Sequence, residues 1–247
     1  MLLTIAIPAF DEIQNIENAV HEAHDSAKRS APGDAEILIV DDGSRDGTGA
    51  VADRLATELP EVRVVHHSGN RGFTGAMATC FREARGDWIF LAPADGQIAM
   101  SEVGRFLEVI PRADIVVGVR ELRVEGAGRK TLSRGFHVIA RLLFGLDIPE
   151  FSSVFLFRRS LLASMRFRSA RRSAALLPEI LFRARRRGAR FVLLTVVQHP
   201  RTAGRAKGGQ LSVAALTGAE LLRVALLSRL DEHGVQKVAR VRPDSAR

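Results

Sequence analysis

The first half of the chain alternates short apolar runs with segments in which apolar residues recur every three or four positions. The runs are typical of buried strands, and the recurring positions are typical of helices that bury one face. The expected strands are Leu2–Ile7, Glu36–Val40, Val62–Val65, Trp88–Leu91 and Ile115–Val119, and the expected helices are Ile13–Ala27, Thr48–Leu59, Gly72–Ala84 and Ser101–Ile110. This alternation predicts an α/β fold in which a mainly parallel sheet is covered by helices on both faces.

The second half is less regular. Residues 121–134 are polar and contain two glycines, so a loop is expected there. The other expected elements are a helix over Phe136–Leu146, a strand over Phe151–Arg159, a helix over Pro178–Arg187, a strand over Phe191–Val197, a basic glycine-rich loop over Arg201–Gln210 and a weakly amphipathic helix over Leu211–Leu230. We expect one domain over 1–210, followed by a C-terminal helix and tail over 211–247.

The composition is that of a folded protein. Of the 247 residues, 46% are hydrophobic and 26% are charged, which excludes disorder along the whole chain. The one cysteine, Cys80, excludes a disulfide scaffold and is expected to be a buried apolar residue. His66 and His67 have no partner at metal-ligand spacing and are interpreted as structural. No signal peptide and no membrane-spanning helix are expected, which predicts a cytoplasmic protein.

The net charge of +8 is concentrated late in the chain, where thirteen arginines lie between Arg158 and Arg205. Such a segment is typical of a nucleic-acid partner, an anionic membrane surface or a phosphorylated substrate, and equally of a solvated surface. No aromatic stacking run or zinc motif accompanies the arginines, so specific nucleic-acid binding is not expected.

Polar motifs follow the ends of the predicted strands, where ligands bind in open parallel sheets. After the first strand, Pro8 ends the strand, Phe10 offers a ring that can stack on a base, and Glu12 can accept hydrogen bonds from a base or ribose. The alternative is a strand-to-helix turn in which Asp11 or Glu12 favours the helix N-terminus.

Two adjacent carboxylates, Asp41 and Asp42, end the second strand. They repel each other unless a cation or a hydrogen-bond donor offsets their charge. A ribose hydroxyl, a base N–H or a metal ion would do so. The alternative is a turn with an N-cap from Ser44, Asp46 or Thr48.

The third and fourth strands are followed by candidate phosphate and metal positions. Gly69–Gly75 opens a helix whose N-terminus favours anions, with Arg71 as a further positive charge. A glycine-rich loop without a ligand is the alternative there. Asp95 and Gln97 stand two residues apart, so their oxygen atoms can share a hard cation such as Mg²⁺ or Mn²⁺.

In this order, the motifs resemble those of family 2 glycosyltransferases with the GT-A fold, and above all their polyprenyl-phosphate, dolichyl-phosphate mannose synthase-like branch. The matching segments are Pro8–Glu12, Val40–Thr48, Asn70–Ala76, Pro93–Gln97, Gly118–Arg120 and His199–Lys207. The resemblance covers nearly the whole chain to about Lys207. It implies a nucleotide-sugar-binding half over 1–120 and an acceptor-binding half over 121–210.

The resemblance also implies roles for individual residues. Pro8, Phe10, Glu12, Ile39 and Asp41 match contacts to the base and ribose; Ala94, Asp95 and Gln97 match contacts to the diphosphate and metal; Arg201 and Lys207 match cations that grip the donor's phosphates; Arg120 and Arg134 match cations for the acceptor's phosphate. The implied donor is a nucleoside diphosphate sugar. The implied acceptor is a polyprenyl phosphate, such as undecaprenyl or dolichyl phosphate.

Three departures from the family pattern change these expectations. Pro93 replaces the first carboxylate of D-x-D, so we expect a weakened Mg²⁺ or Mn²⁺ site that relies on Asp95, Gln97 and phosphate oxygens. Phe10 keeps the ring of the usual tyrosine but lacks its hydroxyl. The C-terminal membrane spans frequent in this branch are not expected here, which keeps a soluble hydroxyl acceptor open as an alternative.

The implied reaction is an inverting displacement at the anomeric carbon, in which Asp95 with its cation offsets the charge of the departing diphosphate. A phosphate acceptor needs no strong base, whereas a hydroxyl acceptor does, and Glu179 is the candidate. The alternative for Glu179 is a carboxylate that favours a helix N-terminus. A nucleotide-binding relative that lost its activity with the carboxylate at Pro93 is a further interpretation.

The arginine-rich segment also predicts a peripheral contact with the inner face of the cell membrane. Arg166, Arg168, Arg171 and Arg172, together with the helix Leu211–Leu230, would rest on anionic lipid. The alternative is a solvated basic face above a core helix. The oligomeric state is not predicted.

Overall fold

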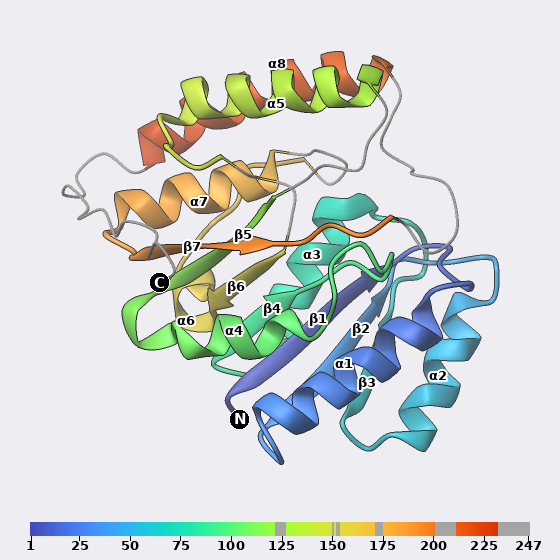
Figure 1. The fold of residues 1–247 in the computed structure, drawn as a ribbon. Coiled ribbons are helices and arrows are strands. Elements are labelled where there is room, and N and C mark those ends of the chain that lie inside the picture. Colours follow the sequence, from blue (N-terminus) through green and yellow to red (C-terminus); the bar gives the residue numbers. More distant parts are fainter. Residues whose placement is uncertain (122–126, 150, 152–153, 171–174, 201–210, 232–247) are drawn as a thin grey trace.

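The computed structural model describes residues 1–121, 127–149, 151, 154–170, 175–200 and 211–231. A seven-stranded sheet has the strand order β3-β2-β1-β4-β6-β5-β7 (Figure 1). The strands are β1 (Leu3–Ala9), β2 (Ala35–Asp41), β3 (Val62–His66), β4 (Trp88–Leu91), β5 (Ile115–Arg120), β6 (Phe155–Arg158) and β7 (Phe191–Val196). Neighbouring strands are parallel, except that β6 is antiparallel to β4 and β5. The predicted mainly parallel sheet is confirmed.

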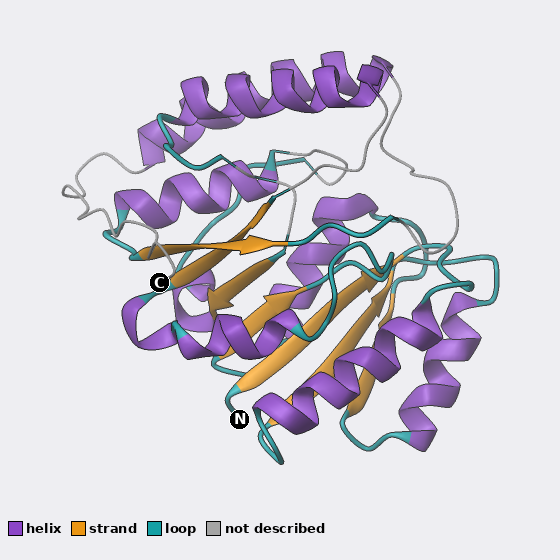
Figure 2. Cartoon of the chain, in the orientation of Figure 1, coloured by secondary structure: helices purple, strands orange, loops and turns teal. Residues whose placement is uncertain are grey.

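Helices cover both faces of the sheet (Figure 2). They are α1 (Ile16–Ser30), α2 (Thr48–Glu58), α3 (Gly72–Glu83), α4 (Glu102–Glu108), α5 (Ala127–Phe144), α6 (Arg159–Ala163), α7 (Leu176–Arg186) and α8 (Leu211–Asp231), with a 3-10 turn at Ile110–Arg112. Buried residues of α1, α2 and α4 pack on one face, and those of α3, α5, α6, α7 and α8 pack on the other.

The central strands are buried on both sides, which explains their continuous apolar sequence. On β1, Leu3, Ile5 and Ile7 belong to the core beneath α1, whereas Ala6 belongs to the core on the α3 side. All four side chains are fully buried. Since burial of each large aliphatic side chain contributes about 1.5–3 kcal/mol, this strand fixes the middle of the sheet.

The second half departs from the sequence expectations at two places. A loop is predicted over 121–134, but α5 begins at Ala127. Helix formation is cooperative, so the apolar repeat further along carries the helix back through Gly128 despite the cost of a glycine. The strand predicted over Phe151–Arg159 is shorter, because Arg159 starts the unpredicted helix α6.

Helix α8 joins the core through Leu221, Val224 and Ala225, which are buried with residues of α5 and α7. Figure 1 shows α5 and α8 side by side along the outer layer of the molecule. Over the described ranges, the helices lack the combination of length and hydropathy that a membrane span requires.

Candidate functional site

The carboxyl ends of β1 and β2 are tied together by short hydrogen bonds. The backbone N–H of Asp11 donates to Ser44 Oγ at 2.9 Å, and that of Glu12 donates to Thr48 Oγ1 at 2.8 Å. Asp11 lies in the left-handed region (φ 49°), which aspartate tolerates better than most residues. The loop that carries the half-buried Phe10 is therefore fixed beside the end of β2.

Asp41, the last residue of β2, is almost fully buried at this edge. Its Oδ1 accepts the backbone N–H of Ser44 at 3.0 Å, and its Oδ2 lies 3.0 Å from Nδ1 of His66. Burial raises the pKa of the Asp41 carboxyl, but the hydrogen bonds from Ser44 and His66 outweigh it, so that the pKa is lowered. Asp41 is therefore an anion at neutral pH.

Asp42 caps helix α3. Its carboxylate accepts the backbone N–H groups of Arg71 and Gly72, each at 2.8 Å, and its Oδ1 lies 2.6 Å from Nδ1 of the buried His67. The amides of Arg71 and Gly72, at the helix start that was predicted as an anion site, thus bind a carboxylate of the protein itself. Ligand binding at Gly69–Gly75 stays a prediction. His67 has the structural role that was predicted.

The loops after β2 and β3 meet at two glycines. Gly43 has φ +75°, and a Cβ at this position would lie 2.8 Å from the backbone of Gly69. Any larger residue at position 43 would push the two loops apart, so Gly43 sets how closely the ends of β2 and β3 approach.

The loop after β4 places Asp95 and Gln97 against the chain that follows β7. Asp95 is 8% exposed, and its Oδ1 accepts the backbone N–H of Gln97 at 3.1 Å. The carbonyl oxygen of Gln97 accepts the backbone N–H of His199 at 2.8 Å. The segment that leads into the late basic loop therefore starts at the predicted metal and diphosphate position, next to the buried Ala94.

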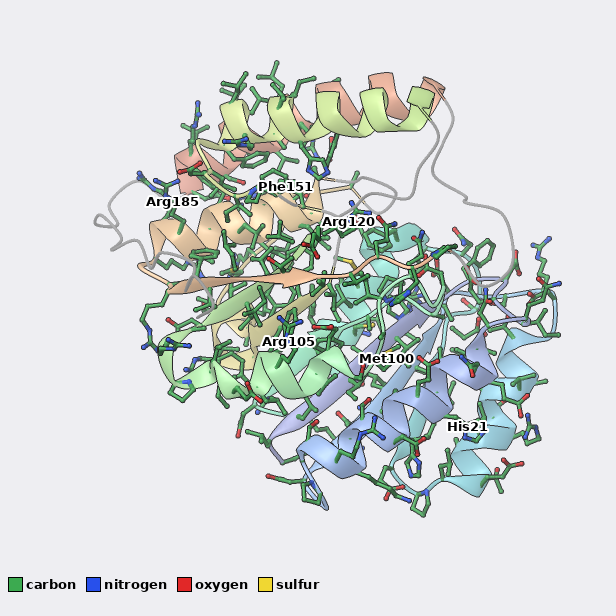
Figure 3. All side chains as sticks on the ribbon, in the orientation of Figure 1. His21, Met100, Arg105, Arg120, Phe151 and Arg185 are labelled. Atoms are coloured by element: carbon green, nitrogen blue, oxygen red, sulfur yellow. The ribbon has the colours of Figure 1, made fainter. Side chains whose placement is uncertain are left out.

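Arg120 ends β5 on the same edge. Because β6 is antiparallel to both β4 and β5, the carboxyl ends of β4 and β5 lie at one edge of the sheet. At β1 the prediction that Pro8 ends the strand is wrong, because Pro8 pairs with Val40 and the strand continues to Ala9. The half-buried Phe10 is the first residue after this strand. In Figure 3, Arg120 lies at the end of β5 that is nearer to α5.

Two predicted site residues are turned into the interior instead. Ile39 is fully buried among the core residues beneath α1 and α2. Glu179 is also fully buried: its Oε1 accepts the backbone N–H of Arg168 at 2.7 Å and the Nε–H of Arg183 at 2.8 Å, and its Oε2 accepts both the backbone N–H and the hydroxyl of Ser169. So enclosed a carboxylate is not poised to take a proton from an acceptor.

Other predicted residues fall outside what the structure describes. Arg201, Lys207, Arg171 and Arg172 lie outside the described residues, and Arg134 lies in α5 but its side chain is not described. Cys80 is buried, and burial raises the pKa of its thiol, as expected of a core residue.

The residues present suit a hard cation that brings its own phosphate ligands. Mg²⁺ in nucleotide sites is held by one or two carboxylates together with phosphate oxygens and water. Across the part of the chain that the structure describes, no three histidine, cysteine, aspartate or glutamate side chains are grouped to hold a metal ion. That Asp95 and Gln97 hold the ion, with the lower affinity expected from Pro93, stays a prediction.

Sequence reasoning missed the position of His66. It is the last residue of β3, one position beyond the predicted strand, and pairs in register with Asp41. Ligands bind at the carboxyl ends of strands in open parallel sheets, and this rule applies to the end of β3 as it does to the other strands. The position of His66 at a strand end was therefore the signal that could have identified it.

Comparison with known proteins places the chain among sugar transferases. The profile of the family described as Glycosyl transferase family 2 matches residues 4–171. The undecaprenyl-phosphate mannosyltransferase of Micrococcus luteus is 33% identical over 162 residues, 62% of this chain and 63% of that protein. The polyprenol monophosphomannose synthase of Mycolicibacterium smegmatis is 30% identical over 164 residues, 60% of this chain and 58% of that protein. The matched part is less than two thirds of either relative.

Solved structures share the architecture. A mannosyltransferase from Pyrobaculum calidifontis in complex with GDP-Man and Mn²⁺ superposes with a TM-score of 0.60 at 17% identity, covering 93% of this chain and 74% of that chain. Glucosyl-3-phosphoglycerate synthase from Mycobacterium tuberculosis in complex with Mn²⁺, UDP-glucose and phosphoglyceric acid gives 0.65 at 18% identity, covering 91% and 79%. These likenesses confirm the predicted GT-A fold.

Proposed function

Because the chain belongs to glycosyl transferase family 2, we propose that it transfers a sugar from a nucleoside diphosphate sugar to the phosphate of a polyprenyl lipid. The observation that carries this proposal is the edge where β1, β2, β4 and β5 end. Phe10, Asp41, Asp95 and Arg120 all stand at this edge, so a ring face, two carboxylates and a cation are available along one side of the sheet.

The residues at this edge can bind the base, the ribose and the diphosphate of the donor. Phe10 offers a ring face to a base, and the anionic Asp41 accepts hydrogen bonds from a base or ribose. The diphosphate would lie beside Asp95, and Arg201 and Lys207 are the cations that the sequence predicts for it. The backbone N–H of His199, shortly before these residues, donates to the carbonyl oxygen of Gln97. Neighbours of known structure hold GDP-mannose or UDP-glucose, so both bases belong in the test.

We propose that Asp95 and Gln97 hold Mg²⁺ or Mn²⁺ together with the donor's phosphates. A divalent cation there would offset the negative charge that grows on the leaving diphosphate. Pro93 leaves one carboxylate fewer for this task, so the cation's affinity depends on the donor being present.

The proposed transfer needs no general base. An oxygen of the acceptor's phosphate attacks the anomeric carbon, the bond from that carbon to the donor's diphosphate breaks, and the nucleoside diphosphate leaves with inversion. A phosphate monoester is already anionic at neutral pH, which fits the enclosure of Glu179. Arg120, with Arg134 as a second cation, would hold the acceptor's phosphate.

Relatives support the lipid acceptor, since their names specify undecaprenyl phosphate and polyprenol. The test is to supply a labelled UDP- or GDP-sugar with polyprenyl phosphate and follow the label between organic and aqueous phases. We expect label in the organic phase, and a rate lowered about 10²–10³-fold by Asp95→Asn. The matched control is Asp87→Asn, an exposed aspartate at the opposite edge of the sheet, which should keep the wild-type rate.

Each other outcome has a defined meaning. Label that enters a water-soluble glycoside would refute the lipid acceptor and establish the hydroxyl alternative. Donor binding with no transfer and no hydrolysis under any condition would refute the enzyme and leave a nucleotide-binding relative.

We further propose that α5 and α8 rest on an anionic membrane surface. Both helices expose apolar rows: Val138 and Leu142 on α5, and Leu222, Leu226 and Leu230 on α8. The exposed Arg141, Arg223 and Arg229 accompany these rows and supply positive charge toward lipid headgroups. These arginines also have partners within the protein: Arg141 pairs with Asp147, Arg223 pairs with Glu220, and Arg229 donates to the carbonyl oxygen of Leu143. Arg168 likewise forms an ion pair with Asp231.

Sedimentation with vesicles containing anionic lipid tests this contact. Leu142→Asn with Leu226→Asn should lower vesicle binding about tenfold, because two large apolar side chains no longer enter the interface. Ile13→Asn is the control, since Ile13 is exposed at 43% but precedes α1, on the opposite face of the sheet. Equal binding by the double variant and the wild type would refute the contact.

A further inference from the structure

His66 stands between two carboxylates where β2 and β3 end. Its Nδ1 lies 3.0 Å from Asp41 Oδ2, and its Nε2 lies 2.9 Å from Oδ1 of Asp53 on α2. The side chain of Asp41 is 6% exposed, whereas those of His66 and Asp53 are 42% and 64% exposed. The imidazole of His66 therefore links the buried carboxylate of Asp41, at the edge proposed to bind the sugar donor, to the exposed carboxylate of Asp53.

The backbone holds this arrangement in place. Asp41 and His66 are paired residues of neighbouring parallel strands, and the backbone N–H of His67 donates to the carbonyl oxygen of Asp41 at 2.9 Å. A Cβ at Gly49 would lie 2.9 Å from Asp41 Oδ2 and 3.4 Å from His66 Cε1. The contact between Asp41 and His66 thus occupies the space that a side chain at Gly49 would need.

The geometry also favours the doubly protonated form of the ring. Both ring nitrogens face carboxylate oxygens, and only the doubly protonated imidazolium has an N–H for each of them. The hydrogen bonds to Asp41 and then Asp53 raise the pKa of His66 above its ordinary value, although burial opposes them. Within the described residues, these carboxylates, one from β2 and one from α2, are the charged groups that face the ring.

We propose that His66 is a positioning residue for the nucleotide: its Nδ1–H fixes the Asp41 carboxylate in the orientation that receives the base or ribose. This inference rests on the donor role proposed for Asp41. Ser44 holds Oδ1 and His66 holds Oδ2, so the carboxylate is clamped at both oxygens. When the Nδ1–H is lost, Oδ2 is released and the carboxylate can rotate away.

The proposal predicts a pH dependence of nucleotide binding. As the pH rises through the pKa of His66, the ring keeps one N–H for two carboxylates, so the clamp on Asp41 weakens and the affinity for nucleotide falls. Removing the second carboxylate with Asp53→Asn should move the midpoint of this fall to lower pH. The affinity below the midpoint should stay at its wild-type value, because Asp53 touches the ring and not the nucleotide.

Two substitutions separate the two ring nitrogens. His66→Asn places an amide N–H near the position of Nδ1 and should keep the affinity while abolishing its pH dependence. His66→Gln places its N–H near Nε2 instead and should weaken nucleotide binding about tenfold, the effect of one hydrogen bond to a charged group. Calorimetric titration with UDP and GDP in the presence of Mg²⁺, from about pH 6 to about pH 9, measures both.

Nitrogen NMR of the histidine rings in the free protein supplies a readout independent of any ligand. We expect His66 to carry two protons at neutral pH. A single ring proton there, or equal affinities and pH profiles in the wild type and His66→Gln, would overturn the proposal. Failure of the wild type to bind either nucleotide would overturn the proposed function as well, so the two failures are distinguishable.

Discussion

At the residue scale, the three carboxylates at the strand ends have different partners. Asp42 is hydrogen-bonded to His67 and to the backbone N–H groups of Arg71 and Gly72, and Asp41 is hydrogen-bonded to Ser44 and His66. The sequence correctly predicts that adjacent carboxylates here need partners. It does not predict which partners, because His66 and His67 are distant along the chain and reach them only through the register of β2 with β3.

We expect Asp95 to bind a divalent cation, and a substitution at Pro93 tests this expectation. Pro93→Asp restores a second carboxylate two residues before Asp95. We expect it to tighten Mn²⁺ binding, measured calorimetrically in the presence of UDP or GDP, by about tenfold or more, since affinity for hard cations rises with the number of carboxylate ligands. Unchanged Mn²⁺ affinity in a folded variant would mean that the cation does not bind here.

At the scale of elements, the strands were predictable where burial on both faces leaves an uninterrupted apolar run, as in β1 and β2. The start of α5 could not be predicted, because the glycines near residue 127 favour a loop locally, whereas cooperative helix formation extends the helix over this segment. The burial of Glu179 could not be predicted either. Its position near the start of α7 is consistent with a helix-start carboxylate or a base, and only tertiary packing surrounds it with Arg168, Ser169 and Arg183.

The ion pair between Glu179 and Arg183 is enclosed, with side-chain exposures of 0% and 1%. Removing one partner leaves an unpaired buried charge, which costs about 3–5 kcal/mol. We expect Arg183→Met to lower the free energy of unfolding by that amount in denaturant titrations. Arg141→Met, which breaks an exposed pair with Asp147, should change it by less than about 1 kcal/mol. Equal effects of the two substitutions would show that the buried pair contributes no more to the free energy of unfolding than the exposed pair does.

Asp231 closes the same network at the end of α8. Hydrogen bonds from Arg168 and Arg183 lower the pKa of Asp231 from 3.8 to about 2. Since the folded pKa lies below the unfolded one, this stabilisation is present above about pH 4 and is lost as the pH falls toward 2. Unfolding titrations at stepped pH should therefore show a steeper acid loss of stability for the wild type than for Asp231→Asn. Parallel acid profiles would be incompatible with this ion pair.

At the scale of the whole molecule, the two cores separate two tasks. The helices α1, α2 and α4 support the strands whose ends we propose to receive the nucleotide, whereas α5, α7 and α8 form the opposite layer with exposed leucines and arginines. Arg120 ends β5 on the side nearer to α5. A donor bound at the strand ends and a lipid held at the exposed side of α5 and α8 would thus approach each other from different layers of one fold.

The central claim is that the strand ends hold the donor's diphosphate through Asp95 and a cation, and the melting temperature tests it most directly. A ligand that binds only the folded state stabilises it by about 2.7 kcal/mol at a hundred times its Kd. We predict a rise with UDP or GDP that requires Mn²⁺, persists in Asp87→Asn and disappears in Asp95→Asn. An equal rise in Asp95→Asn, or no rise with either nucleotide, would contradict the claim.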